Sequence, residues 1–224
     1  MSTAGAQLRM TAEVFQLAKN NHDRIEDCHF IFHAPDGRGA TTIGVADGVG
    51  GCREKGIDPG EYSEELMLNA LAAVIESGDA AVDPIRVLKE AHSRTAKPGS
   101  STACIITLAA GDGELRFANV GDSGFKVLRR NAVAYESPIQ QSRFNCPFQL
   151  YQAGEDRKLV EECAVEGRVK VEAGDVVVAG TDGLFDNLYG SEIERILVEE
   201  RVHNKGKPMM ELARVIALTA FRNS

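Results

Sequence analysis

Strands in this sequence are expected in runs, and helices in pairs between or after those runs. Segments rich in β-branched residues and bounded by turn residues predict strands at 28–33, 41–46, 101–109, 114–120, 124–129, 132–136, 168–172 and 175–181. Glycine-containing connections at 111–113 and 173–175 are typical of hairpins. Apolar spacing and helix-start signals predict helices at 61–77, 83–94, 191–202 and 208–221. Because strict β-α-β alternation is missing from the pattern, we predict an α+β layered fold.

Length and charge bound the class of protein. The 224 residues suffice for a substantial core, and without an internal repeat or a low-complexity linker we expect one domain over 1–224. The chain has 25 basic and 33 acidic residues, a net charge of −8, which gives a nucleic-acid role no electrostatic support. No apolar stretch approaches the roughly 20 residues that span a bilayer. The five cysteines form no C-x-x-C pair, which disfavours a disulfide framework or a zinc site and favours an intracellular setting.

Three predicted strands end on an aspartate close to a glycine. Asp47 lies in "GVADGVGG", Asp122 in "FANVGDSGF" and Asp182 in "DVVVAGTDGLFDN", with Asp186 shortly after it. A sheet holds such a carboxylate in place, and the glycine lets a backbone carbonyl or a water come close. Oxygen-rich clusters suit hard cations such as Mg²⁺ or Mn²⁺. A single Asp-Gly is more often an ordinary turn, but its recurrence after apolar strands favours a metal site.

Five motifs in order resemble the metal-dependent protein serine/threonine phosphatases of the 2C (PPM) type. They are the Glu26-Asp27 pair before the first strand, "VADGVGG", "GSSTACI", "NVGDSGF" and "TDGLFDN", and they cover about residues 24–190. "VADGVGG" and "FNCPFQL" are similar to the mitochondrial, T-cell-activation-associated branch of that family. The resemblance implies two stacked antiparallel β-sheets flanked by helix pairs, and hydrolysis of phosphoserine and phosphothreonine in phosphoproteins.

The resemblance also implies a dinuclear Mg²⁺ or Mn²⁺ site. Asp47 would bridge the two ions and Gly48 would offer its backbone carbonyl. Glu26 would bind the second ion and Asp182 the first. Two ions at such a spacing lower the pKa of a shared water and supply a hydroxide nucleophile, so no phosphoenzyme is needed.

A third, weaker ion is implied as well. Asp122 and Asp186, together with Asp182, match the family's looser metal position. The hydroxyl run Ser100, Ser101 and Thr102 is interpreted as the start of a strand packed near the site and not as a source of nucleophiles.

The chain departs from the family pattern at three places. Val49 stands where many members carry a histidine proposed as general acid, so the leaving group would be protonated by a metal-bound water or another residue. The usual phosphate-binding arginine position holds His22; Arg24, two residues before Glu26, is our predicted phosphate ligand. No aspartate follows Asp186, so the family's last metal-binding strand is expected to be missing, either by truncation or because fewer ligands suffice.

Two alternatives stay open at this point. A catalytically silent phosphatase-like domain would bind a partner, as Val49 and the missing last aspartate suggest. A plain α+β protein would use its Asp-Gly dipeptides as turns only. For the phosphatase we expect a monomer whose substrate preference depends on the weakly patterned region 136–166. The subgroup resemblance points to mitochondria or a plastid, with the cytoplasm as the other possibility.

Overall fold

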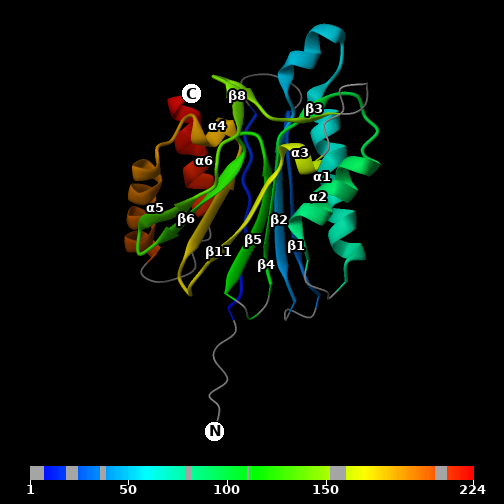
Figure 1. The fold of residues 1–224 in the computed structure, drawn as a ribbon. Helices are drawn as coiled ribbons and strands as arrows, with labels where there is room; N and C mark the ends of the chain where they lie inside the picture. The colour runs from blue at the N-terminus through cyan, green and yellow to red at the C-terminus, as the bar shows by residue number, and fades with distance from the viewer. Residues whose placement is uncertain are drawn as a thin grey trace.

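Two antiparallel sheets form the centre of the computed structural model, which describes residues 8–18, 25–35, 39–78, 82–109, 111, 113–151, 160–204 and 211–224. The five-stranded sheet has the order β1-β2-β4-β5-β11, and the three-stranded sheet has the order β12-β6-β7. In Figure 1 the sheets lie face to face between the helices α1 and α2 on one side and α5 and α6 on the other. The predicted α+β sandwich with flanking helix pairs is therefore confirmed.

The strands fall close to their predicted ranges. The five-stranded sheet contains β1 (Asp27–His33), β2 (Thr41–Asp47), β4 (Ala103–Leu108), β5 (Glu114–Val120) and β11 (Val165–Lys170). The three-stranded sheet contains β6 (Gly124–Arg129), β7 (Ala132–Glu136) and β12 (Val176–Gly180). Two small ladders pair β3 (Ser100–Ser101) with β10 (Leu150–Tyr151) and β8 (Gln141–Arg143) with β9 (Cys146–Pro147). The predicted strand 101–109 is thus broken at Thr102.

The helices cover the outer faces of the sheets. The long helices are α1 (Pro59–Glu76), α2 (Pro84–Arg94), α5 (Gly190–Asn204) and α6 (Leu212–Asn223). Short turns of helix occur at η1 (Gly50–Lys55), α3 (Val160–Cys163) and α4 (Asp182–Phe185). All four predicted helices are present, although residues 208–210 of the last one lie outside the described residues. No helix in the described part of the chain is long and apolar enough to cross a bilayer.

Apolar side chains form three layers of core. Between the sheets, Phe117 and Phe125 meet edge to face with ring centroids 5.1 Å apart, and Tyr135 packs against both. Leu66 of α1 is fully buried in the layer between the five-stranded sheet and its helices. Ile193 of α5 is fully buried in the layer behind the three-stranded sheet. Because each sheet packs against apolar side chains on both faces, its strands are held in place. The loops that follow the strand ends therefore begin at well-defined positions.

One connection was predicted incorrectly. The chain reverses at 173–175 with Gly174 at a φ of +91°, but the strands on either side do not pair with each other. β11 pairs with β5 in one sheet and β12 pairs with β6 in the other. The glycine turn reverses the chain, but it does not decide which strands pair. β11 and β12 join different sheets because Val169 and Val177 both pack into the core between the sheets. The other predicted hairpin, near 111–113, does join the paired strands β4 and β5.

Candidate metal centre

Several elements that carry an acidic residue at their ends meet at one end of the sandwich, the end where α4, β3 and β8 are labelled in Figure 1. Asp27 opens β1 and Asp47 closes β2, and the two are paired directly in the antiparallel register. The carboxyl group of Asp47 is in hydrogen-bonding contact with those of Asp27 and Asp182. Asp182 begins α4, directly after β12 and Thr181. Strands from both sheets therefore deliver carboxylates to one place.

Burial and mutual repulsion make this group electrostatically unusual. The pKa of Asp47 is raised well above its usual range, first by burial and then by the charges of Asp27 and Asp182. The pKa of Asp27 is raised in the same way, by burial and then by Asp182. No cationic side chain is among the causes of either shift. A bound divalent cation would replace this repulsion with attraction, which is the arrangement that such clusters serve.

The hydroxyl run before β4 holds the backbone of Asp47. The Asp47 N–H donates to Thr102 Oγ1 at 3.1 Å, and the Thr102 N–H donates back to the Asp47 carbonyl at 2.9 Å. Ser101 Oγ donates to the same carbonyl at 2.8 Å. Ser101 and Thr102 are almost fully buried. These contacts support their interpretation as positioning groups instead of nucleophiles.

Glu26 and Gly48 are fixed by each other and by α1. The Gly48 N–H donates to the Glu26 carbonyl at 3.1 Å, and Ser63 Oγ donates to that carbonyl at 2.5 Å. A Cβ on Gly48 would collide with the carbonyl oxygen of Pro59. A Cβ on Gly50 would lie 3.3 Å from Glu26 Oε1. The glycines of "GVGG" therefore admit a second backbone and a carboxylate at close range.

Asp122 and Asp186 form a second acidic group beside the first. Burial and then Asp182 and Asp122 raise the pKa of Asp186. Burial and the charge of Asp182 also raise the pKa of Asp122, against a hydrogen bond from Gln141. Gln141 Nε2 donates to Asp122 Oδ2 at 2.9 Å. Asp182 is thus the neighbour that both groups share.

Three residues of the site were missed or given no role by the sequence. Asp27 was recognised only as one of an acidic pair, because its neighbour Asp47 becomes visible only with the β1–β2 register. Thr181 stands at the N-cap of α4, but its side chain makes no capping hydrogen bond. The Thr181 hydroxyl donates a hydrogen bond to the Asp27 carboxylate instead. Arg53 Nε donates to Glu26 Oε1 at 2.8 Å. The predicted phosphate ligand Arg24, like His22, lies outside the described residues.

The donor set suits a hard cation. The carboxyl groups and the Gly48 carbonyl offer oxygen, and in the described residues cysteine and histidine take no part. Within the described residues, no three or more His, Cys, Asp or Glu side chains are grouped in a way that could hold a metal ion. Mg²⁺ commonly uses one or two carboxylates and keeps several waters, so an open oxygen site of this kind fits it. Asp47 and Asp182, with Glu26 and the Gly48 carbonyl beside them, would hold the ions.

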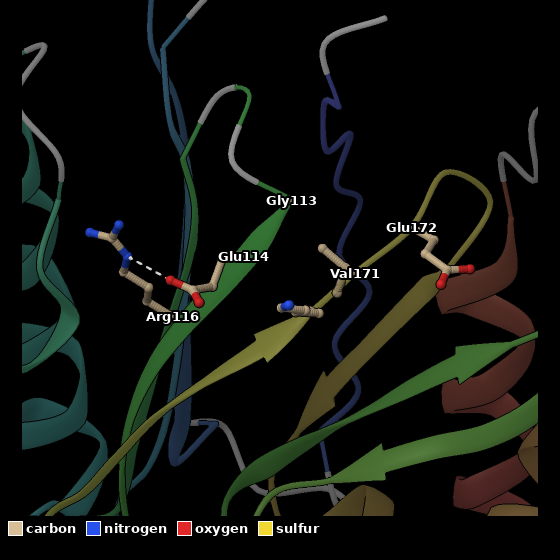
Figure 2. Close-up of a pocket in the computed structure, with 6 residues that line it drawn as sticks. Gly113, Glu114, Arg116, Val171 and Glu172 are labelled. Carbon is tan, nitrogen blue, oxygen red and sulfur yellow. Dashed lines mark ion pairs between the residues drawn. The ribbon is translucent and has the colours of Figure 1, made fainter. Parts of the chain in front are cut away.

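A pocket of about 480 Å³ lies elsewhere, at the opposite end of the sandwich (Figure 2). Its walls are the start of β5 and the end of β11, so the length of a seven-residue strand, about 23 Å, separates it from Asp122. Glu114 and Arg116 face each other across 3.9 Å, and Glu172 pairs with Arg129 at 3.2 Å. Because it lies far from the clustered aspartates, this pocket is not the candidate site.

Comparison with known proteins identifies the family. No family model matches the sequence. The protein is 44% identical to probable protein phosphatase 2C 55 of Arabidopsis thaliana over 197 residues, 88% of this chain and 40% of that one. It is 35% identical to the protein phosphatase PTC7 homolog fig of Drosophila grimshawi over 210 residues, 86% of this chain and 67% of that one. The chain belongs to the protein phosphatase 2C family.

Solved structures of phosphatases have the same fold. The X-ray structure of the photosystem II phosphatase PBCP matches with a TM-score of 0.75 and 32% identity over 87% of this chain and 72% of that one. The catalytic domain of the phosphatase PstP, in complex with two manganese ions, matches with a TM-score of 0.59 at 14% identity, which shows the fold alone. The chain spans 40% and 47% of the lengths of the two Arabidopsis relatives named phosphatases 2C 55 and 2C 80.

Proposed function

We propose that this chain is a single catalytic domain that hydrolyses phosphoserine and phosphothreonine in proteins, using two Mg²⁺ or Mn²⁺ ions. The observation that carries the proposal is the hydrogen-bonding contact of the Asp47 carboxyl group with those of Asp27 and Asp182. Membership of the phosphatase 2C family supports it. When bound, such ions supply Lewis acidity toward the phosphoryl oxygens and lower the pKa of water.

The chain's own residues would hold and orient the reacting groups. Asp47 would contact both ions, Glu26 and Asp182 one each, and the Gly48 carbonyl would complete the set. Asp122 and Asp186, with Asp182, would form a third and weaker position. Ser101 and Thr102 bind the Asp47 backbone and so hold this residue in place at the end of β2. A fixed carboxylate costs no rearrangement during the reaction.

Turnover of a phosphopeptide or of p-nitrophenyl phosphate with millimolar Mn²⁺ tests the proposal. We expect activity that a chelator abolishes and that Asp47→Asn and Asp182→Asn each reduce at least a hundredfold, since each removes a charge that holds the ions. Asp83→Asn is the matched control: Asp83 caps α2 through Ile85 N–H, and asparagine caps equally well. Activity that survives the chelator and both site variants would refute the mechanism.

The alternative is a catalytically silent domain that binds a phosphoprotein. Val49, which has no proton to donate, is the feature that favours it. Partner binding that persists in Asp47→Asn, together with no turnover by the wild type in Mn²⁺, would select this alternative over the enzyme.

The subgroup resemblance supports a proposed location, and the expected assembly is a separate proposal. We place the protein in mitochondria or a plastid and expect a monomer. Imaging of the full-length protein fused to a fluorescent tag tests the first statement, and light scattering after size exclusion tests the second.

A further inference from the structure

We propose that Arg53 binds the phosphoryl group of the substrate at this site. The inference rests on the proposed function, because it assigns a residue to a phosphate monoester. Arg53 belongs to η1, which follows the Asp47 strand directly. Its Nε donates to Glu26 Oε1 at 2.8 Å, and Glu26 in turn acts electrostatically on both Asp27 and Asp47. The guanidinium therefore stands one side chain away from the carboxylate group.

The free part of the guanidinium has the right chemistry for a phosphate. Nε is occupied by Glu26, while the two terminal nitrogens have no partner within the part of the chain that the structure describes. The side chain is 44% exposed, so a ligand can reach it from solvent. Two parallel N–H groups of one guanidinium match two oxygens of a phosphate.

The local backbone holds Arg53 in this position. The Gly56 N–H donates to the Arg53 carbonyl at 2.9 Å and closes the turn. Gly50 leaves the Glu26 carboxylate room against η1, because a Cβ there would stand 3.3 Å from Oε1. Glu26 is itself held through its carbonyl by Gly48 and Ser63. Hydrogen bonds to the backbone carbonyls of Arg53 and Glu26 thus hold both partners of the ion pair in place.

A purely stabilising ion pair explains these facts less well. Exposed ion pairs contribute little to stability, and Arg86 with Glu90 on α2 shows the same Nε–Oε1 contact at 2.8 Å outside the candidate site. Beside a carboxylate that is to hold a cation, an arginine weakens cation binding through repulsion. Acidic side chains repel a phosphate that approaches the site. The positive charge of Arg53 offsets this repulsion, so it favours binding of an anion and not of a cation.

The test compares Arg53→Gln, Arg53→Lys and the control Arg86→Gln in the full chain with saturating Mn²⁺. For Arg53→Gln we expect the KM for a phosphopeptide and the inhibition constant of inorganic phosphate to rise about ten- to a hundredfold, the range for loss of charged hydrogen bonds. Arg53→Lys should recover only part of this, since an ammonium is not a two-pronged donor. Arg86→Gln should match the wild type.

A readout without turnover separates this role from support of Glu26. Calorimetric Mn²⁺ affinity of Arg53→Gln should equal or exceed that of the wild type, while the rise in Tm caused by phosphate with Mn²⁺ should disappear. Unchanged phosphate inhibition, or a loss of Mn²⁺ affinity that accounts for the whole effect, would overturn the assignment. If the wild type turns over no substrate but gains Tm from phosphate through Arg53, the inference stands and the proposed function falls. If phosphate has no effect on a wild type that hydrolyses the phosphopeptide, the inference falls and the proposed function stands.

Discussion

Asp27 and Asp47 lie opposite each other at the ends of β1 and β2, with their carboxyl groups in hydrogen-bonding contact. In most antiparallel pairs, two like charges in this position would destabilise the sheet. Here Asp182 adds a third carboxyl group from the other sheet. We interpret the arrangement as a cation-binding site. Repulsion among the carboxyl groups destabilises the free protein, and bound cations would remove this repulsion.

Asp27→Asn should weaken metal binding although Asp27 has no assigned ligand role. Its carboxyl group contacts Asp47 and accepts from Thr181, so it orients the group expected to bridge the ions. Loss of such a supporting group commonly costs about 10- to 100-fold in metal affinity or activity. Calorimetric titration with Mn²⁺ measures this, with Asp83→Asn as control. An affinity equal to that of the wild type would show that Asp27 is dispensable.

Asp47→Asn should separate stability from metal binding. In a chelator, we expect its Tm to equal or exceed that of the wild type, because one of several clustered, buried carboxyl groups is gone. With Mn²⁺ at about a hundred times its dissociation constant, the wild type should gain roughly 5–10 °C and the variant none. Scanning calorimetry with and without the metal measures both. A large loss of Tm in the chelator would instead point to a structural role.

Gly48→Ala should destabilise the fold, and Gly51→Ala should not. A Cβ on Gly48 meets the backbone carbonyl of Pro59, whereas a Cβ on Gly51 meets nothing within 4 Å. Because backbone must shift in the first case, we expect a loss of about 1–3 kcal/mol in the free energy of unfolding. The two variants share one motif and one added methyl group, so urea unfolding of the pair isolates the steric effect. Equal midpoints would contradict the close approach of α1.

Asp175→Asn should reduce stability at neutral pH and lose its effect in acid. Burial alone would raise the pKa of Asp175, but hydrogen bonds from Arg129 and the Glu172 N–H, with the charge of Arg129, lower it. An acid with a lowered folded pKa adds stability above its unfolded pKa, and that stability disappears as the pH falls through the folded pKa.

At pH 7, with Arg129 partly open to solvent, we expect the substitution to cost about 1–2 kcal/mol. Urea unfolding in a chelator from pH 7 to pH 3 should show the difference from the wild type shrinking toward zero. A difference that is constant with pH would assign the effect to packing and not to the ion pair.

The sequence by itself determined where the strands and helices lie and which aspartates stand at strand ends. Residues 114–120, 124–129 and 132–136 form strands with the predicted limits, because β-branched content and turn residues act over a few neighbours. Asp47, Asp122 and Asp182 stand at strand ends for the same local reason. Tertiary structure alone decided which strands share a sheet, as β11 and β12 illustrate by joining different ones.

Tertiary structure also decided which side chains meet. Asp27 faces Asp47 because of the β1–β2 register, and Arg53 of η1 reaches Glu26, whose carboxylate lies close to Gly50. Such contacts join residues 20 or more positions apart. Strand register and the stacking of the two sheets bring these residues together in space. Register and stacking depend in turn on the apolar cores, which are built by residues from many parts of the chain.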